Sequence, residues 1–574
     1  MKLRYLINTT IAIVAAATLT ACATAPKAAL PNPNFAINLE GSESPTPADT
    51  PQIDQTALTP SPRIGGHLHA AVPLPATLNP LLNSDPHMAA FLRLIFEPLA
   101  ILDEQMRPMP NPAITQSIVF SPSGTNVAVT LREGIFWEDG SPITAQDIAF
   151  SIDVLRNQSP QTAIYRPNVE NISSHSTLDA RTIQINLANP KWGMMYMLNF
   201  PIIPAEYYRP ISMTNLTAAR NMHPMGNGPF RFYSHELAGH IGLIPNNNAP
   251  GGAPYIQRIT GLILRDMHGA RYAFEQGVID VHKDSPALAG LYAARGKNRA
   301  GDVITNYFDF IGFNFENPIF AHYDARLAVA QSIDLGQVLQ QYIGQVDAAL
   351  APINPNSFIS QSPFASQSSF ASQSPFASQG DSTTQNGSTT QNSSTNQESH
   401  YLPQHNIAHA RWVFLRLGNE YQDYREIRLI VNEDNSQGLD IAQRLLQGLT
   451  EAGVRVSLHA LPFSDFAMRI EQGDFDIMVG AVLLPNMPNV DFLGDIMGYA
   501  SYELDLISSM LRHAPTEAAL ITAAANMQQY FADNLPLIGI GFRRDVLYTS
   551  GHLHVADDVL TNGMFMGAGG WFMQ

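Results

Sequence analysis

Residues 426–458 contain the pattern that most limits the fold of this chain. Glu426 to Asn432 (EIRLIVN) has the character of a strand, Ile441 to Ala452 that of a helix, and Val454 to Leu458 that of a second strand. Two strands joined through a helix lie parallel in one sheet, because the helix carries the chain back to the edge from which the first strand started. This part of the chain is therefore predicted to form a βαβ unit within an α/β fold.

Further periodic segments predict strands and a helix in the first half. Asn126 to Leu131 (NVAVTL) and Thr182 to Leu187 (TIQINL) alternate apolar and polar residues, as strands with one buried face do. Thr144 to Arg156 (TAQDIAFSIDVLR) starts with a threonine suited to a helix N-cap and continues with a helical apolar stripe. The body of the chain is predicted to contain more than one sheet.

Length and charge limit the classes of function. The 574 residues correspond to roughly three or four units of about 150 residues each. Asp and Glu number 49 against 32 Lys and Arg, which gives a net charge of −17. This balance argues against a nucleic-acid partner, because phosphate binding needs basic patches.

The single cysteine, Cys22, follows a segment that resembles an export signal. One cysteine excludes an intramolecular disulfide, a thiolate zinc site or an iron–sulfur cluster within the chain. Two basic residues among the first five precede a short apolar stretch from Ile11 to Leu19. The sequence LTAC at 19–22 resembles the lipobox of bacterial lipoproteins. The resemblance implies a signal peptide over residues 1–21 and a lipid on Cys22 that anchors the exported protein at the membrane, on its periplasmic or extracellular side. An uncleaved anchor is the alternative.

Two other segments lack the periodicity of folded structure. Residues 22–62 are rich in Pro, Ala, Thr and Ser, which predicts a flexible tether. Residues 356–403 contain a six-residue repeat in which Gln recurs from Gln361 to Gln397. Such a repeat is compatible with a parallel β-helix. However, its last three units (STTQNG, STTQNS, STNQES) have no apolar residue with which to offset the entropy of ordering. We therefore favour a disordered, low-complexity insert.

Motifs spread along the body resemble those of one protein family. The run from Thr130 to Ile148 (TLREGIFWEDGSPITAQDI) looks like the signature of the family 5 extracellular solute-binding proteins. These are the oligopeptide-, dipeptide- and nickel-binding components of ABC importers. Further matches follow in the family's order: LNPL at 78–81, GNGPF at 226–230, IGFN at 311–314 and GDFD at 473–476.

The resemblance implies an α/β, two-lobed periplasmic-binding-protein fold of class II with the ligand cleft between the lobes. Residues 63–306 would form lobe I, with a subdomain at about 103–203, residues 307–539 would form lobe II, and residues 540–574 would return to lobe I. The lobes would close on the ligand by a hinge motion. The liganded protein, expected to be a monomer without cofactor or enzymatic activity, would deliver a peptide or other small solute to a membrane permease and its ATPase.

The resemblance also places the candidate ligand-binding residues. In peptide binders of this family, an acidic residue soon after the GDFD segment often meets a charged end of the ligand. Here Asn486 and Asn489 occupy the acidic positions, and Asp491 is the nearest carboxylate. Either the cleft takes a ligand without a buried free amine, or Asp491 or a carboxylate of lobe I replaces the missing acids. The candidate binding residues are Asn227, Phe313, Asn314, Asn486, Met487 and Asn489.

Other classes of function have weaker support in the sequence. His67-x-His69 and His552-x-His554 place histidine pairs on one strand face, where they could ligate a metal. The family also includes nickel and haem binders. The chain contains no His-Glu-x-x-His, Gly-x-Ser-x-Gly or Walker-type motif, so hydrolase activity is not expected. A receptor that senses a peptide without transporting it would need the same two-lobed body, and it remains open beside import.

Overall fold

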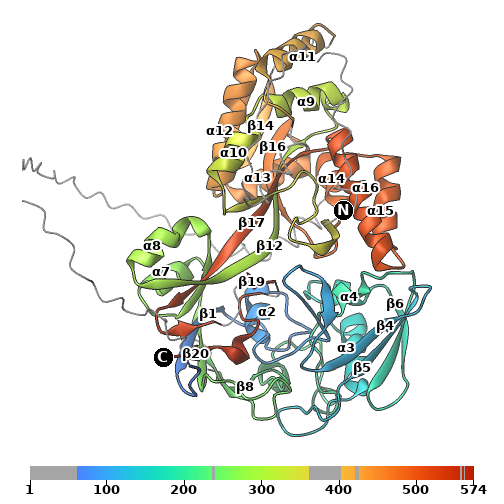
Figure 1. Ribbon diagram of the computed structural model, residues 1–574, viewed down its shortest axis with the longest axis vertical. Coiled ribbons are helices and arrows are strands. Elements are labelled where there is room, and N and C mark those ends of the chain that lie inside the picture. Colours follow the sequence, from blue (N-terminus) through green and yellow to red (C-terminus); the bar gives the residue numbers. More distant parts are fainter. Residues whose placement is uncertain (1–60, 236–238, 361–402, 421–425, 556–558, 562) are drawn as a thin grey trace, which may run out of the picture.

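The computed structural model describes residues 61–235, 239–360, 403–420, 426–555, 559–561 and 563–574 (Figure 1). The predicted signal peptide with Cys22, the tether up to residue 60, and the insert from 361 to 402 lie outside these residues. Within the described ranges, no helix is long and apolar enough to cross a membrane.

The lower half of the molecule in Figure 1, called lobe I below, contains two four-stranded sheets. In the first, β1 lies parallel to β10, and the pairs β10–β9 and β9–β8 are antiparallel. Helix α2 packs Phe91 against Gly261 of β10, where a Cβ atom would lie 2.8 Å from the Phe91 ring. The elements are β1 (His67–Pro73), α2 (Pro86–Leu92), β8 (Phe230–His235), β9 (His240–Pro245) and β10 (Arg258–Leu264).

The second sheet of lobe I is antiparallel, with the order β4-β5-β7-β6. Its elements are β4 (Thr115–Phe120), β5 (Asn126–Leu131), β6 (Ile172–Thr177), β7 (Thr182–Leu187) and the helix α3 (Ala145–Asn157). The predicted strands at β5 and β7 are confirmed, and alternate residues of each are buried. The predicted start of α3 is confirmed too, because Thr144 is its N-cap and the Asp147 carboxylate accepts a hydrogen bond from the Thr144 backbone N–H.

Short elements complete lobe I. They are β2 (Ala100–Leu102), β3 (Pro108–Pro110), α4 (Met194–Met197), α5 (Ala205–Tyr208), α6 (Ala219–Met222), α7 (Gly269–Glu275), α8 (Ala289–Ala294), β18 (Leu553–His554) and β20 (Phe572–Met573).

The largest sheet joins the two halves of the molecule. Its main order is β11-β17-β12-β16-β14-β15, with β13 beside β17 and β19 beside β12. Strands β12 and β17 are long and antiparallel, and both extend through lobe I and the upper half, called lobe II (Figure 1). Strands β14 and β15 lie parallel and are joined through α12, which confirms the predicted βαβ unit. The elements are β11 (Val281–Asp284), β12 (Lys297–Phe313), β13 (Val346–Ala348), β14 (Ile427–Asn432), α12 (Ser436–Glu451), β15 (Val456–Leu461), β16 (Ile477–Leu483), β17 (Ile538–Ser550) and β19 (Val559–Leu560).

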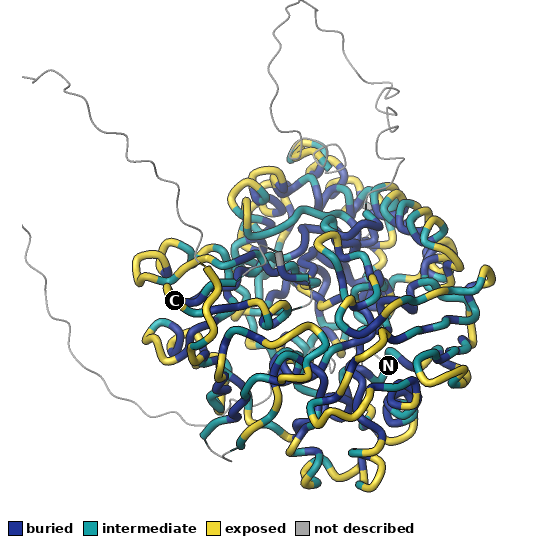
Figure 2. The backbone as a smooth tube through the Cα atoms, turned by 60° about the horizontal axis from the view of Figure 1, so that its bottom comes forward, coloured by how far each residue is buried: buried dark blue, intermediate teal, exposed yellow. Residues whose placement is uncertain are grey.

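Helices cover both faces of this sheet in lobe II. The neighbours Leu429 and Ile430 of β14 belong to different buried clusters, because successive side chains point to opposite faces of a strand. Helices α9 to α12 contribute to one cluster and α13 to α16 to the other. Figure 2 shows the buried backbone gathered inside the molecule, with exposed segments at its edges. The helices not yet given are α9 (Tyr323–Gln331), α10 (Leu335–Gln341), α11 (Ile407–Glu420), α13 (Phe463–Gln472), α14 (Asp491–Met497), α15 (Tyr502–Arg512) and α16 (Glu517–Asn534).

Strands β12 and β17 each pack in the core of lobe I along one part of their length and in a core of lobe II along another. Val303 of β12 and Leu547 of β17 belong to the core of lobe I, whereas Phe308 and Phe542 belong to a core of lobe II. Between these points the pairing of β12 with β17 shifts register, from Ile304 to Phe308. The domain boundaries expected from the sequence, and the subdomain at about 103–203, stay a prediction.

The structure corrects the start of the low-complexity insert. Disorder was expected from residue 356, but residues 356–360 belong to the fold, and Phe358–Ser360 form a short 3₁₀ helix, η4. Phe358 and Ile359 are buried and join a core cluster of lobe II. These apolar side chains find packing partners that offset their ordering entropy, so the first repeat unit is not equivalent to the polar units at the end of the repeat.

Candidate functional site

The two lobes contact each other through one shared apolar cluster. Leu102, Met106 and Tyr196 of lobe I are buried in the same cluster as Phe358 and Met487 of lobe II. Helix α4, which contains Tyr196, lies at the lobe II side of lobe I (Figure 1). Apolar contacts between the lobes gather at this place, which we call the lobe junction, and Arg107 of lobe I also pairs there with Glu517 of lobe II.

Aromatic side chains and backbone hydrogen bonds fix the lobe junction. The backbone N–H of Phe358 donates to the carbonyl oxygen of Gln105 at 2.8 Å, and that of Trp192 donates to Ala514 at 2.7 Å. The Trp192 ring meets the Phe358 ring edge-on, with centroids 6.1 Å apart. The guanidinium of Arg107 lies 4.3 Å from the centroid of the Phe358 ring. Phe358 is thus held by three side chains or backbone groups of lobe I.

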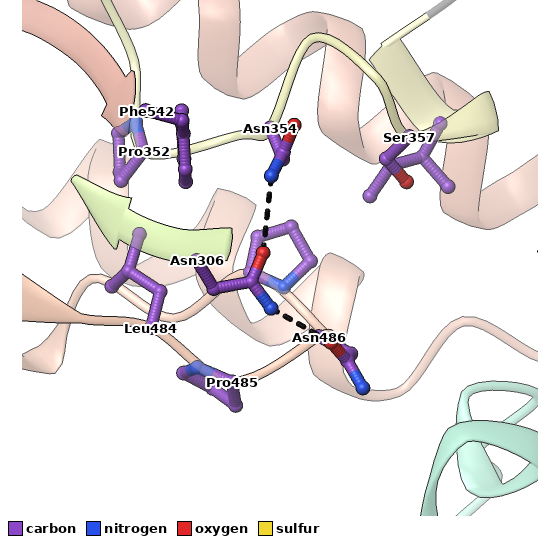
Figure 3. Close-up of a pocket in the computed structure, with 10 residues that line it drawn as sticks. Asn306, Pro352, Asn354, Ser357, Leu484, Pro485, Asn486 and Phe542 are labelled. Atoms are coloured by element: carbon purple, nitrogen blue, oxygen red, sulfur yellow. Dashed lines mark hydrogen bonds between the residues drawn. The ribbon is translucent and has the colours of Figure 1, made fainter. Parts of the chain in front are cut away.

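A pocket lies on the lobe II side of this junction (Figure 3). Its cavity volume is about 10 Å³, room for about one water molecule, and the empty space is about 230 Å³ when its open mouth is included. The lining comes from β12, from η4 and the loop before it, from the loop after β16, and from β17, and none of the ten residues described there is acidic or basic. The lining residues are Asn306, Pro352, Asn354, Ser357, Ile359, Leu484, Pro485, Asn486, Pro488 and Phe542.

Three asparagines form a chain of hydrogen bonds along this pocket (Figure 3). Asn354 Nδ2 donates to Asn306 Oδ1 at 3.1 Å, and Asn306 Nδ2 donates to Asn486 Oδ1 at 2.7 Å. Sequence analysis identified Asn486 but missed Asn306 and Asn354. The signal available for Asn354 was its place among other polar residues in the run Asn354-Pro-Asn-Ser357. No pattern among its neighbours in the sequence marks Asn306 as a residue of the pocket.

The other candidates after GDFD have separate contacts. Met487 is buried, and its sulfur lies so close to Gly193 of lobe I that a Cβ atom there would be 2.3 Å away. Asn489 Oδ1 accepts a hydrogen bond from the backbone N–H of Asp491 at 2.7 Å, at the start of α14. The Asp491 carboxylate accepts from Arg512 at 2.9 Å. Met487 therefore belongs to the lobe junction, whereas Asn489 orders a helix start.

The candidates at the crossing into lobe II do not line the pocket. Phe313 is fully buried in the second core of lobe II. Asn314 Nδ2 donates to the carbonyl oxygens of Gly473 and Phe475, at 3.0 and 2.9 Å. This asparagine therefore holds the loop that contains the GDFD segment.

Asn227 lies in lobe I beside a buried carboxylate. Its Oδ1 accepts a hydrogen bond from the backbone N–H of Glu97 at 2.9 Å, while its buried Nδ2 has no hydrogen-bond partner among the residues that the structure describes. Burial raises the pKa of Glu97, although the hydrogen bond from Asn111 favours its charged form. Glu97 is a polar residue of lobe I that was not among the binding residues predicted from the sequence.

A buried ion pair lies near the pocket, on the same strands. Arg543 of β17 makes two hydrogen bonds with Asp309 of β12, at 2.7 and 2.6 Å. Asp309 is only 2% exposed. Although burial disfavours the charged guanidinium, Asp309 raises the pKa of Arg543. Asp309 and Arg543 therefore balance each other's charge and fill each other's hydrogen-bonding positions.

The two histidine pairs noted in the sequence meet at Asp280. The backbone N–H and the ring Nδ1 of His69 lie 2.8 and 3.2 Å from Asp280 Oδ2. His552 Nε2 lies 3.4 Å from Oδ1 of the same carboxylate. His67 instead bonds Thr260 at 2.7 Å. Among the residues that the structure describes, no group of three or more His, Cys, Asp or Glu side chains could hold a metal ion.

Comparisons with known proteins agree with the motifs in the sequence. The family model of bacterial extracellular solute-binding proteins, family 5 Middle, matches residues 109–501. A putative ABC transporter peptide-binding protein of Brucella ovis is 24% identical over 252 residues, which are 43% of this chain and 47% of that protein. The oligopeptide-binding protein AppA of Bacillus subtilis is 22% identical over 308 residues, which are 52% of this chain and 55% of that protein. The chain thus matches about half the length of these curated relatives.

Solved structures share the fold. The substrate-binding protein CtaP of Listeria monocytogenes superposes with a TM-score of 0.72 at 17% identity, covering 89% of this chain and all of that one. NikZ of Campylobacter jejuni, solved in complex with Ni(L-His), gives 0.63 at 16% identity, covering 90% of this chain and all of that one. These likenesses establish the two-lobed α/β architecture and leave the ligand open.

Proposed function

Because the chain belongs to the family 5 bacterial extracellular solute-binding proteins, we propose that it captures peptides between its two lobes for an ABC importer. The peptide ligand is suggested by the names of the curated relatives, which are called peptide-binding or oligopeptide-binding proteins. The ligand would be delivered to a membrane permease and its ATPase.

The single observation that best supports this proposal is the pocket at the lobe junction. Its lining combines apolar side chains with a row of amide groups from Asn306, Asn354 and Asn486. A peptide backbone offers alternating N–H and C=O groups, which amides can meet without burying a net charge. Met487, directly after Asn486, touches lobe I at Gly193, so a ligand bound here lies where the lobes meet.

Native mass spectrometry of the protein as purified tests the ligand class. We expect a series of co-purifying masses that differ by residue weights and that disappear after unfolding and refolding. A single non-peptide molecule or a metal complex would contradict the peptide proposal and favour another small solute. The refolded protein should bind peptides in isothermal titration and leave them intact, since cleavage would show an enzyme.

The membrane attachment is a separate part of the proposal. We propose that Cys22 carries the lipid, that residues 22–62 form a tether, and that the folded body works as a monomer outside the cytoplasm. Replacing Cys22 by Ser should release the protein from the membrane fraction and abolish labelling by a palmitate analogue. Retention of the C22S variant in the membrane would favour an uncleaved anchor instead.

A further inference from the structure

The asparagine chain at the pocket has a fixed direction, because backbone groups orient its inner end. Asn354 Nδ2 donates to the carbonyl oxygen of Thr305 at 2.9 Å, and its Oδ1 accepts from the backbone N–H of Asn356 at 3.0 Å. A carbonyl can only accept and a backbone N–H can only donate. The Asn354 amide therefore has one orientation, in which its nitrogen also faces Asn306.

The fixed orientation of the Asn354 amide also sets the orientations of the Asn306 and Asn486 amides. Since Asn306 Oδ1 accepts from Asn354, its nitrogen points the other way and donates to Asn486 Oδ1 at 2.7 Å. Asn486 thus uses its oxygen within the protein and keeps its amide nitrogen at the outer end. Figure 3 shows that nitrogen directed away from the other two asparagines, on the side where a lobe I segment lies. The row of three asparagines therefore ends in the two N–H groups of the Asn486 amide, which can donate to a ligand.

The surroundings favour a neutral acceptor as the partner of these donors. The ten lining residues contribute no charged side chain, so neither an ammonium nor a carboxylate would find an opposite charge there. The hydroxyl groups of Ser357 in lobe II and Tyr196 in lobe I are both buried and face each other across the lobe junction.

We propose that the chain Asn354–Asn306–Asn486 makes this pocket select a neutral carbonyl oxygen and reject a free ammonium. For a peptide, this means that the end bound here is an acylated amino terminus. The inference rests on the proposed peptide-binding function. It favours the first of the two hypotheses drawn from the sequence, a cleft for a ligand without a buried free amine, because Asn486 presents a donor where an ammonium would need an acceptor.

Isothermal titration with matched peptides tests the selection. The ligands are the free-amine and N-acetylated forms of one co-purified peptide, or of tetra-alanine if no peptide co-purifies. We expect the acetylated form to bind at least about tenfold more tightly, which corresponds to ~1.4 kcal/mol. Tighter binding of the free-amine form, or equal binding of both, would overturn the inference while leaving peptide binding intact.

The substitution Asn306→Asp tests the mechanism without touching Asn486. A carboxylate at 306 has only acceptors, so Asn486 must turn its nitrogen toward it and present its oxygen to the ligand. The preference should then reverse toward the free amine. The control is Leu483→Asp, which adds the same charge nearby at a residue that is 43% exposed and does not line the pocket. An equal reversal in the L483D variant would show a charge effect alone, and the inference would fail.

A second measurement separates failure of the inference from failure of the proposed function. If the unmodified protein binds neither peptide form, peptide binding is wrong, and the inference is judged from the asparagine chain itself. Neutron diffraction from deuterated crystals distinguishes N–D₂ from oxygen on each amide. Deuterium on Asn486 facing away from Asn306 supports the donor site, and deuterium facing Asn306 overturns it.

Discussion

Two polar clusters three residues apart on β12 show opposite ways of placing polar groups beside a ligand pocket. Asp309 is buried, and both of its carboxylate oxygens accept hydrogen bonds from Arg543. Asn306 is only partly buried and belongs to a neutral chain that ends at Asn486, whose oxygen accepts from Asn306 and whose nitrogen is directed away from it. The first cluster is closed and can only stabilise the fold. The second is open at one end, so it can act on a ligand.

The largest effect is expected where the lobes contact each other. Phe358→Ala removes a ring that is 2% exposed and packed against Trp192 and Arg107 of lobe I. Loss of a buried phenylalanine ring costs about 3–5 kcal/mol, so urea unfolding should move to much lower concentration. The control is Phe364→Ala in the next repeat unit, which is predicted from the sequence to leave stability within about 0.5 kcal/mol. Equal losses in both variants would contradict a special role for Phe358.

Breaking the closed cluster should have the next largest effect. Asp309→Asn leaves Arg543 without its charge partner, and water reaches only part of a guanidinium side chain that is 31% exposed. We expect a loss of about 2–3 kcal/mol in the free energy of unfolding. The double variant D309N/R543Q should recover part of this loss, because it removes the unpaired charge as well. If D309N unfolds like the unmodified protein, the ion pair is not the stabilising element proposed here.

Glu138 is a third case to set beside Asp309 and Asn306, because its carboxylate accepts from a backbone N–H instead of pairing with a cation. Glu138 accepts from the backbone N–H of Gly226 at 3.2 Å, and burial raises its pKa to about 7. The folded state then holds the proton more tightly than the unfolded state, so stability increases as the pH falls from about 8 to about 5. After allowance for partial exposure, this gain is about 1–2 kcal/mol.

The variant E138Q should lose this pH-dependent gain, as measured by thermal unfolding across the same pH range. The control is Glu133→Gln, at a carboxylate that is 80% exposed beside Arg181, and it should keep the profile of the unmodified protein. If E138Q keeps the pH profile of the unmodified protein, the assignment of the gain to Glu138 is wrong.

The smallest effect on stability is expected at the open cluster. Asn486→Ala removes the outer member of the chain, and Asn306 Nδ2 can turn to water because this residue is partly exposed. Unfolding should change by less than about 0.5–1 kcal/mol, while affinity for the acetylated peptide falls about tenfold. A large loss of stability without loss of affinity would show that Asn486 serves the fold.

The parts of the fold that the sequence predicts are those with a local pattern. Alternation at β5 and β7, and the N-cap before α3, depend on neighbours a few residues away, and the structure has them as predicted. The βαβ unit from β14 to β15 has the same origin. These elements follow from periodicity and capping, which act within one helix or strand.

The asparagine chain could not be predicted in this way. Asn306 and Asn486 lie 180 residues apart in the sequence, and they meet because β12 and β16 are neighbours in the large sheet. Resemblance located Asn486 by its distance from the GDFD segment, but it also selected Phe313 and Asn314, whose contacts are internal to lobe II. A side chain's direction at a strand end depends on pairing that no local pattern records.

The register shift in β12 has a mechanical consequence. A sheet bends most easily where its ladder of hydrogen bonds is interrupted, and β12 is interrupted between Ile304 and Phe308, where it passes from one lobe to the other. The bending of the sheet is thus expected within a few residues of β12, and Asn306 is one of them. We expect bending there to change the separation of Asn306 from Asn486, so that a hinge motion of the lobes would strain the hydrogen bond between these two amides.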